Sequence, residues 1–361
     1  MLRRIPQLDA VRGIAILVVI FHNEAGQYPS LGLQAIFAHG WMGVDLFFVL
    51  SGFLITGILL DSKASPGYLR DFYARRCLRI WPLYYAVLAF MFLVVPIVRP
   101  SEAHTIFAER SSPWWAYPLF LQNFLVPVPA LATGPLGVTW SLAIEELFYL
   151  AWPWIVRLGS PASLRWGAFV VIVFSPAMRL ILSHYDVILY SNPFCRLDGL
   201  MAGALLASLV RTEGFVARRY VPAAWIMLLV AGPLALLVEA TEGQWLAFSF
   251  VAIASAAFVY LALFEDRVWF RKAMSNPFLV YTGTISYGLY LLHKIPFNAL
   301  HALSPIDWPI LEFGAGLLAC YAAAILSWHV LERPFLKMKR FFDSSARPVE
   351  ASGTSLALSQ R

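Results

Sequence analysis

Long runs of apolar residues recur along nearly the whole chain, and they constrain its fold more than any other feature. Residues 41–60, for example, contain a single charged side chain, Asp45. A run of that length covers the ~30 Å hydrocarbon core of a bilayer only as a helix, because a helix satisfies its own backbone hydrogen bonds. Only 13% of the 361 residues are charged, whereas soluble domains carry about a quarter. The sequence therefore predicts an all-α integral membrane protein, a bundle of helices with 13 Trp, 15 Tyr and 27 Phe available for interfacial belts.

We predict ten transmembrane segments. They lie near residues 8–23, 41–60, 80–98, 139–157, 165–183, 195–210, 220–238, 246–264, 278–297 and 309–331. One further apolar stretch, 112–127, is short and contains Pro113, Pro118 and Pro127, which disfavour a regular helix. We expect this stretch to be a re-entrant or interfacial element that does not cross.

The distribution of Lys and Arg predicts the orientation, since cytoplasmic loops carry an excess of both. With a cytoplasmic N-terminus and 112–127 uncrossed, the outer segments hold only Arg99, Arg110 and Lys294. The inner segments then hold Arg3, Arg4, Lys63, Arg70, Arg75, Arg76, Arg79, Arg157, Arg165, Arg211, Arg218, Arg219, Arg267, Arg271, Lys272, Arg333, Lys337, Lys339 and Arg340. We therefore expect a multi-pass protein of the cell inner (cytoplasmic) membrane with both termini cytoplasmic. Residues 1–341 are predicted to form the transmembrane domain and 342–361 a disordered cytoplasmic tail.

The net charge of +6 does not indicate nucleic-acid binding, because the basic residues fall at the helix ends. No soluble catalytic segment is evident, so any chemistry is expected within the membrane. The three cysteines, Cys77, Cys195 and Cys320, show neither CxxC nor metal-ligand spacing, and no metal is expected.

Ionisable residues inside the predicted spans are costly and therefore mark candidate functional sites. In the first span, Asp9 and Arg12 lie three residues apart and can pair on one helix face. His22, near the outer end, fits either an interfacial histidine or a catalytic one. Asp45, in the second span, fits either a functional carboxylate or a helix-packing carboxylate bonded to a neighbouring arginine.

Two further clusters have helical spacing. Arg76 and Arg79 place two guanidinium groups on one face just before the third span, an arrangement suited to phosphate oxygens. Contact with anionic lipid is the alternative interpretation. Ser141, Glu145 and Tyr149 lie at i, i+4 and i+8 of one face, with Glu146 beside them.

Most intramembrane ionisable residues fall in the outer half under this topology. They are His22, Asp45, Glu145, Arg196, Asp198 and His293. Packing explains each of them taken singly, but together they indicate one polar chamber that opens outward.

Seven motifs in fixed order resemble the membrane-bound acyltransferase-3 family. They are LDAVRGIAILVVIFH, GVDLFFVLSGFLITGIL, RRCLRIWPLYY, TWSLAIEELFYLAWP, RLDGLMAG, SYGLYLLH and ERPF, within residues 5–340. Members of this family O-acylate lipopolysaccharide O-antigens, exopolysaccharides, Nod factors and macrolides. The resemblance implies a ten-helix catalytic domain that uses acyl-coenzyme A, with acetyl as the expected acyl group.

The resemblance also implies roles for individual residues. His22 matches the family's first-helix histidine and Arg12 its arginine partner; Arg76 and Arg79 match a pair associated with coenzyme A. Asp45 and Glu145 match carboxylates of two other motifs. The chain departs from the family at one point, because nine residues separate Arg12 from His22 instead of ten. At ~100° per residue, His22 lies about 80° off the face of Arg12, and Asn23 occupies the usual position.

These observations predict an O-acyltransferase that moves an acyl group from acyl-coenzyme A to a hydroxyl of an envelope polysaccharide, glycolipid or similar acceptor. His22 is the expected general base, since no other histidine lies in the first helix, and Glu145 or Asp45 could orient it. Arg12, Arg76 and Arg79 are expected to bind the donor, and no cofactor is expected to be permanently bound. The predicted substrate-side residues are Trp140, Arg196, Asp198, Tyr287 and His293. The alternative is a transporter or flippase for a polar or lipid-linked solute, since buried charges also mark solute pathways.

Overall fold

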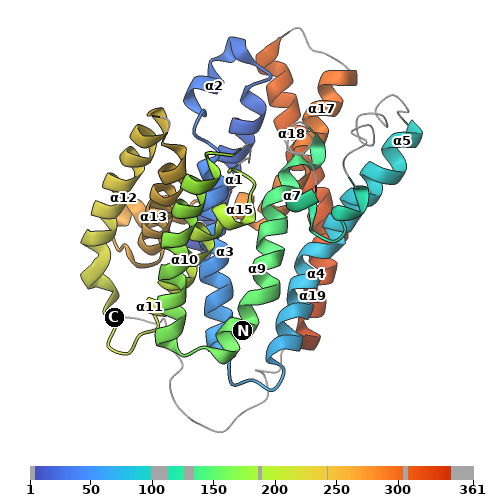
Figure 1. Cartoon of the computed structure of the whole chain (residues 1–361). Coiled ribbons are helices and arrows are strands. Elements are labelled where there is room, and N and C mark those ends of the chain that lie inside the picture. The colour runs from blue at the N-terminus through green and yellow to red at the C-terminus, as the bar shows by residue number, and fades with distance from the viewer. Residues whose placement is uncertain are drawn as a thin grey trace.

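The computed structural model describes residues 5–98, 113–125, 134–185, 189–241, 243–303 and 308–342. Within these residues every regular element is a helix and no strand occurs, so the all-α prediction is confirmed for them (Figure 1). The predicted tail, 342–361, lies outside the described residues except for Phe342, which ends a 3-10 turn.

In the part of the chain that the structure describes, six helices are long and apolar enough to cross a membrane. They are α3 (Met42–Asp61), α4 with its extension (Tyr68–Val98), α10 (Pro161–Leu182), α12 (Ala217–Ala240), residues Trp245–Phe264 of α13 (Gln244–Phe264), and α18 with its extension (Pro309–Phe342). They coincide with six of the predicted spans, and a multi-pass membrane protein follows from them.

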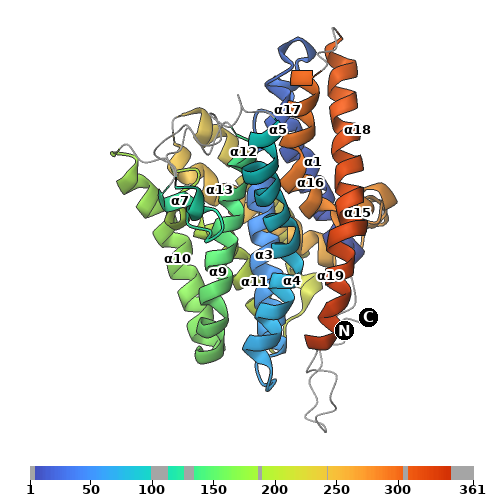
Figure 2. The same cartoon turned by 90° about the vertical axis from the view of Figure 1, so that its right-hand side faces the viewer.

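Two of these helices are compound. The first runs from α4 (Tyr68–Ala89) through a π-helical turn (Phe90–Val94) into α5 (Val95–Val98). The second runs from α18 (Pro309–Ser327) through another π turn (Trp328–Glu332) into α19 (Arg333–Lys337) and the 3-10 turn Met338–Phe342. Figure 2 shows α18 and α19 following one another along the side of the bundle, next to α4.

The other four predicted spans are helical too, but less regular or more polar. α1 (Pro6–Ala25) and α9 (Thr139–Leu158) are 20 residues long and carry acidic and basic side chains, and α11 (Leu197–Leu209) has only 13 residues. The range 278–297 is interrupted twice, at Ile285 and at His293, and divides among α15 (Pro277–Thr284), α16 (Ser286–Leu292) and α17 (Lys294–Leu303). The count of ten spans therefore stays a prediction.

Short helices connect these elements. In the predicted 112–127 element, the described part contains a 3-10 turn (Trp114–Ala116) and one turn of helix, α7 (Gln122–Leu125). The remaining short elements are the 3-10 turns Pro29–Leu31, Pro135–Val138 and Pro193–Cys195 and the helices α2 (Leu33–Ile36) and α14 (Val268–Met274). Whether 112–127 is re-entrant stays a prediction.

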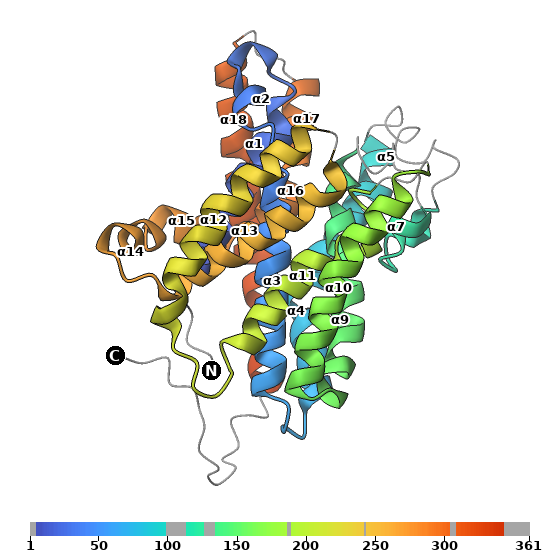
Figure 3. The same ribbon diagram turned by 60° about the vertical axis from the view of Figure 1, so that its left-hand side comes forward.

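α3 is the central helix of the bundle. It packs against α1, α9, α11 and α13. In its apolar 18-residue stretch 72% of the residues are buried, compared with 17% in the corresponding stretch of α12 and 22% in that of α10. In Figure 3, α12 and α13 lie side by side at the edge of the molecule, with α14 and α15 projecting beyond them. Large side chains of α12 such as Leu229 and Leu237 are more than 60% exposed, as expected for a helix that faces lipid.

α3 and α11 approach each other closely because each contributes a glycine at the contact. A Cβ added at Gly52 would lie 1.9 Å from the carbonyl oxygen of Leu200, and one at Gly203 would lie 2.0 Å from that of Val49. Any other residue would push the backbones apart, as expected for small residues at membrane helix contacts. This reciprocal contact brings the N-terminal half of α3 against the start of α11, where the polar residues of the next section meet.

Candidate active site

The polar side chains inside the bundle gather in three groups. The arginine group comprises Arg12, Arg76, Arg79 and Glu145. The ion-pair group comprises Asp45, Arg179, Arg196 and Asp198. The histidine group comprises Asn23, Glu24 and His293.

In the arginine group, cations from α1 and α4 converge. Nη1 of Arg12 donates to Oδ1 of Asp9 at 2.6 Å, which confirms the predicted pair within the first helix. Arg12 also lies within electrostatic range of Arg76 and Arg79. The guanidinium of Arg76 lies 5.7 Å from the ring centroid of Tyr149, a cation–π distance.

α9 supplies the carboxylate that faces these cations. Glu145 lies within electrostatic range of Arg76 and Arg12 and beside the hydroxyl groups of Ser51 and Tyr149. Ser51 Oγ and Tyr149 OH are themselves 2.5 Å apart. The predicted shared face of Glu145 and Tyr149 is thus directed at the arginine group.

Tyr287 lies on the same side, although the sequence assigns it to the substrate side. Its hydroxyl donates to the carbonyl of Ile80, one residue after Arg79, at 2.7 Å. Its ring also lies within electrostatic range of Glu332 and Arg79.

The ion-pair group joins three helices, α3, α10 and α11, through two buried pairs. Nη2 of Arg196 donates to Oδ2 of Asp45 at 2.8 Å, and Nη2 of Arg179 donates to Oδ2 of Asp198 at 2.9 Å. All four side chains are at most 1% exposed. Ser249 of α13 bonds both members of the second pair. Of the two interpretations open for Asp45, this geometry matches a packing carboxylate bonded to an arginine.

Arg196 is enclosed by aromatic rings. Its guanidinium carbon lies 4.0 Å from the ring centroid of Phe248, 5.2 Å from that of Tyr190 and 5.7 Å from that of Trp140. Its Nε and Nη1 are buried and have no hydrogen-bond partner among the described residues. The predicted substrate-side residues Trp140, Arg196 and Asp198 therefore do lie together.

The histidine group lies where the helix breaks between α16 and α17. Nδ1 of His293 lies 2.8 Å from the carbonyl oxygen of Tyr290, and Nε2 lies 3.0 Å from the amide nitrogen of Asn23 and 3.8 Å from Oε1 of Glu24. His293 and Glu24 are both fully buried.

His22 points elsewhere. Its Nδ1 lies 2.9 Å from the carbonyl oxygen of Phe37, in the loop that follows α1, and its side chain is half-buried. Asn23 thus faces the interior at the position where the family has its histidine, as the spacing from Arg12 predicts.

Tyr290 connects the three groups. Its hydroxyl lies 2.6 Å from Oγ of Ser141, its ring centroid lies 6.2 Å from that of His293, and it is within electrostatic range of Glu145 and Arg196. Apart from His22, the predicted chamber residues therefore lie around Tyr290 as separate clusters instead of one.

Sequence reasoning assigned no role to Tyr290, Glu24 or Arg179. A signal was present for Arg179, which is a charge inside an apolar segment, whereas none was present for Tyr290. For Asn23 the spacing from Arg12 gave the helix face but no partner.

A polar chain leads from the histidine group to the outer loops. The hydroxyl of Tyr28 donates to Oε1 of Glu312 at 3.3 Å, and Nδ1 of His301 lies 2.8 Å from the same oxygen. Burial, together with the neighbouring Glu312 carboxylate, raises the pKa of Tyr28 to about 12. Tyr28 is therefore a hydrogen-bond donor here and not a proton carrier near neutral pH.

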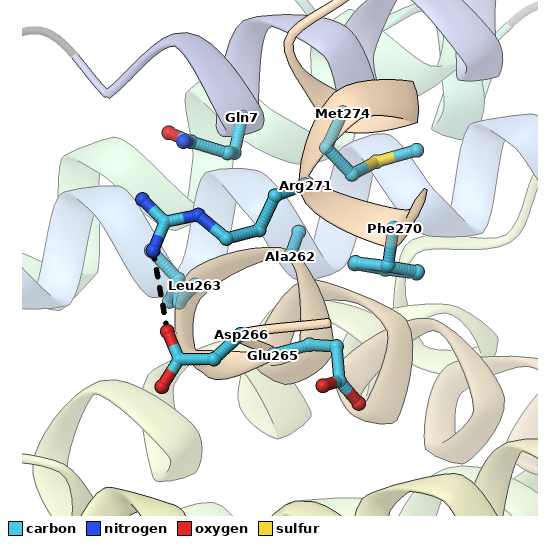
Figure 4. Close-up of a pocket in the computed structure, with 8 residues that line it drawn as sticks. All are labelled: Gln7, Ala262, Leu263, Glu265, Asp266, Phe270, Arg271 and Met274. Atoms are coloured by element: carbon cyan, nitrogen blue, oxygen red, sulfur yellow. Dashed lines mark hydrogen bonds and ion pairs between the residues drawn. The ribbon is translucent and has the colours of Figure 1, made fainter. Parts of the chain in front are cut away.

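A small pocket of about 80 Å³ lies away from all three groups, where α1 begins and α13 meets α14 (Figure 4). Arg271 donates to Asp266 across it at 3.3 Å. Burial raises the pKa of Glu265 at its edge, but hydrogen bonds from the Trp225 indole and the Arg267 amide outweigh that effect and lower it. These ionised partners hold the helix junction together, and the pocket is not part of the candidate site. Within the described ranges, no three His, Cys, Asp or Glu residues are placed to hold a metal ion.

Comparison with known proteins identifies the family. A family model described as an acyltransferase domain, of the acyltransferase-3 type, matches residues 5–329. Two proteins named O-acetyltransferase OatA, from Staphylococcus aureus strains NCTC 8325 and COL, are each 26% identical over 368 residues, covering 93% of this chain and 58% of theirs. The chain thus spans little more than half the length of these relatives. No solved structure matches the chain.

The match to residues 5–329 includes all three polar groups and most of the 361-residue chain, and the protein therefore belongs to the acyltransferase-3 family.

Proposed function

We propose that the protein is an O-acyltransferase that moves an acyl group, acetyl in the first instance, from acyl-coenzyme A to a hydroxyl of an envelope polysaccharide, glycolipid or similar acceptor. The observation that carries this proposal is that Arg12 of α1 lies within electrostatic range of Arg76 and Arg79 of α4, the pair that the family motif associates with the donor. The names of the S. aureus relatives agree with acetyl as the transferred group.

The arginine group binds the donor. Coenzyme A carries a diphosphate and a ribose phosphate, and guanidinium groups bind such oxygens in pairs. Arg76 and Arg79 follow the short inner connection between α3 and α4 under the predicted topology of ten spans and cytoplasmic termini. The nucleotide therefore stays at the cytoplasmic side while the pantetheine arm reaches toward Tyr290 at the junction of the three groups.

The acceptor approaches from the outer side. Trp140, Arg196, Asp198 and His293 lie there, and aromatic rings beside buried hydrogen-bond donors suit a sugar ring with hydroxyl groups. Tyr287 belongs to the donor end by its contacts with the helix of Arg79.

An imidazole of the outer half is the general base. The resemblance gives this role to His22, and its contact with Phe37 supports the assignment in one respect. A carbonyl can only accept a hydrogen bond, so Nδ1 of His22 carries the proton and Nε2 keeps a lone pair for the acceptor hydroxyl. Neither Glu145 nor Asp45 then acts on His22 directly. Glu145 lies beside Ser51 and Tyr149, Asp45 pairs with Arg196, and both carboxylates contribute to the charge balance of the site.

Label transfer tests the reaction. Membranes that contain the protein receive acetyl-coenzyme A labelled in the acetyl group, and the label is followed into a polysaccharide or glycolipid fraction. We expect transfer by the wild type, a raised KM for acetyl-coenzyme A in Arg76→Gln and Arg79→Gln, and unchanged kinetics in the matched control Arg219→Gln, an exposed arginine of α12. Movement of a solute across the membrane without label transfer would support the transporter alternative instead.

A further inference from the structure

The helix is interrupted at His293, between α16 and α17, and the imidazole of His293 lies against the carbonyl oxygen of Tyr290. Pro296 follows three residues after His293 and has no N–H to continue the helical hydrogen bonds across the break. Interrupted backbone at membrane depth is tolerated where it is buried in protein or lines a polar cavity. His293 at this break is fully buried within the bundle.

The hydrogen bonds of His293 fix which nitrogen carries the proton. Nδ1 faces the carbonyl of Tyr290 at 2.8 Å and must donate to it, since a carbonyl cannot donate. Nε2 therefore holds the lone pair and accepts from the amide of Asn23 at 3.0 Å. The side chain is thus a neutral imidazole whose basic nitrogen is directed at α1.

Glu24 provides the partner that a protonated imidazole needs, and Lys294 is a second cation within electrostatic range of this carboxylate. Its Oε2 accepts from Gln27 at 2.8 Å, whereas its buried Oε1 has no hydrogen-bond partner among the described residues and lies 3.8 Å from Nε2 of His293. A buried polar atom without a partner costs free energy, and such atoms in native structures call for a functional explanation. An imidazolium Nε2–H would supply the missing donor.

The position of Asn23 connects this geometry with the reaction. Asn23 is eleven residues after Arg12, which at ~100° per residue returns it to within about 20° of the same helix face. His22 lies off that face and bonds a loop carbonyl. The imidazole nearest the inward face of α1 in this chain therefore comes from the break after α16.

We propose that His293, in place of His22, is the general base of the acyl transfer, with Asn23 as a positioning residue and Glu24 as the carboxylate that stabilises the imidazolium. This inference rests on the proposed function. The acceptor hydroxyl replaces the Asn23 amide at Nε2, its oxygen bonds to the thioester carbonyl carbon, and its proton passes to Nε2. The C–S bond then breaks, and the thiolate of coenzyme A takes that proton back, so that an ester and a free thiol leave a neutral imidazole.

Two isosteric variants of the full-length protein test the proposal. His293→Gln keeps an acceptor for Asn23 but has no basic nitrogen, and we expect label transfer to fall by about 10²–10⁴-fold, the range for loss of a general base. Glu24→Gln keeps the size and the bond to Gln27, and a smaller loss is expected. The matched control is His329→Gln, because Nδ1 of His329 also faces a helix carbonyl, at 2.9 Å from Ile325, but on an exposed side chain.

The readouts separate catalysis from folding. Both site variants should elute as the wild type does, with a Tm close to its value and an unchanged KM for acetyl-coenzyme A, while kcat falls. We expect kcat/KM of the wild type to fall at acid pH as His293 is protonated, and this acid limb should disappear in His293→Gln. If that variant does not fold, the kcat and Tm of Glu24→Gln decide the question.

The inference is overturned if His293→Gln transfers label at the wild-type rate. It is also overturned if the single substitution His22→Gln causes the same loss of kcat. In both cases the wild type still transfers label and the proposed function stands. Absence of transfer by the wild type would refute the proposed function itself.

Discussion

Replacing Gly203 by alanine should weaken the bundle at the contact between α3 and α11. The added Cβ would lie 2.0 Å from the carbonyl oxygen of Val49 and 2.6 Å from the backbone nitrogen of Phe53. Both atoms belong to the backbone of the facing helix, so no side-chain rotation relieves the clash. Reaching an ordinary 3.4 Å contact requires 3.4 − 2.0 = 1.4 Å of separation between two central helices.

The expected cost follows from that displacement. Overpacking a well-packed core costs about 1–3 kcal/mol, and a backbone clash of this size belongs at the upper end. At roughly 2 °C per kcal/mol for a large domain, the Tm should fall by about 6 °C. The same movement would stretch the Asp45–Arg196 pair across this interface, so transfer activity should fall as well.

The matched control is Gly232→Ala in α12. A Cβ at Gly232 meets nothing within 4 Å among the described atoms, and alanine favours a helix over glycine by up to about 1 kcal/mol. Thermal unfolding of both purified variants in one detergent gives the comparison, with the control expected at or above the wild-type Tm. A Gly203→Ala protein as stable as the wild type, or an equal loss in both variants, would refute the packing argument.

Three further changes have defined outcomes. Asp45→Asn leaves the guanidinium of Arg196 buried without its counter-ion, and we expect the free energy of unfolding to fall by about 3–5 kcal/mol, seen as a lower denaturation midpoint. In a double-mutant cycle, adding Arg196→Met should recover part of this loss, whereas additive losses would contradict the pairing. Arg79→Gln should raise the KM for acetyl-coenzyme A about tenfold with little change in kcat, as a loss of about 1.4 kcal/mol of ground-state binding requires; a lower kcat at constant KM in initial-rate measurements would exclude a donor-binding role. Tyr290→Phe removes the hydroxyl that meets Ser141, and kcat should fall while the KM for the donor stays constant; wild-type kcat would show that Tyr290 only packs.

The fold class could be predicted because each long apolar run by itself indicates a membrane-spanning helix. Residues 41–60 needed no partner to be recognised as a span, and α3 covers them. The interruptions at Ile285 and His293 could not be predicted from hydropathy, because residues 278–292 contain no charged side chain that would mark a break. Pro296 follows the second interruption, and the segment packs against α1 and α18.

The candidate site was predictable only where partners are close in sequence. Asp9 and Arg12 were paired from helix geometry alone, and the same geometry placed Asn23 on the face of Arg12. Asp45 and Arg196 are 151 residues apart, and only tertiary packing selects this arginine from the others. For the same reason the outer polar residues were predicted as one chamber, whereas tertiary packing divides them into groups around Tyr290.

The separation of Asp45 from Arg196 also bears on how the protein is made. Synthesis of the 151 intervening residues takes roughly 10–30 s at ordinary elongation rates. Throughout that interval the nascent α3 carries a carboxylate whose counter-ion has not yet left the ribosome, and its apolar residues must keep it inserted against a penalty of about 3 kcal/mol. Arrival of α11 cancels the charge and also supplies the glycine contact, so docking of α11 on α3 is the step that commits the growing chain to its final assembly.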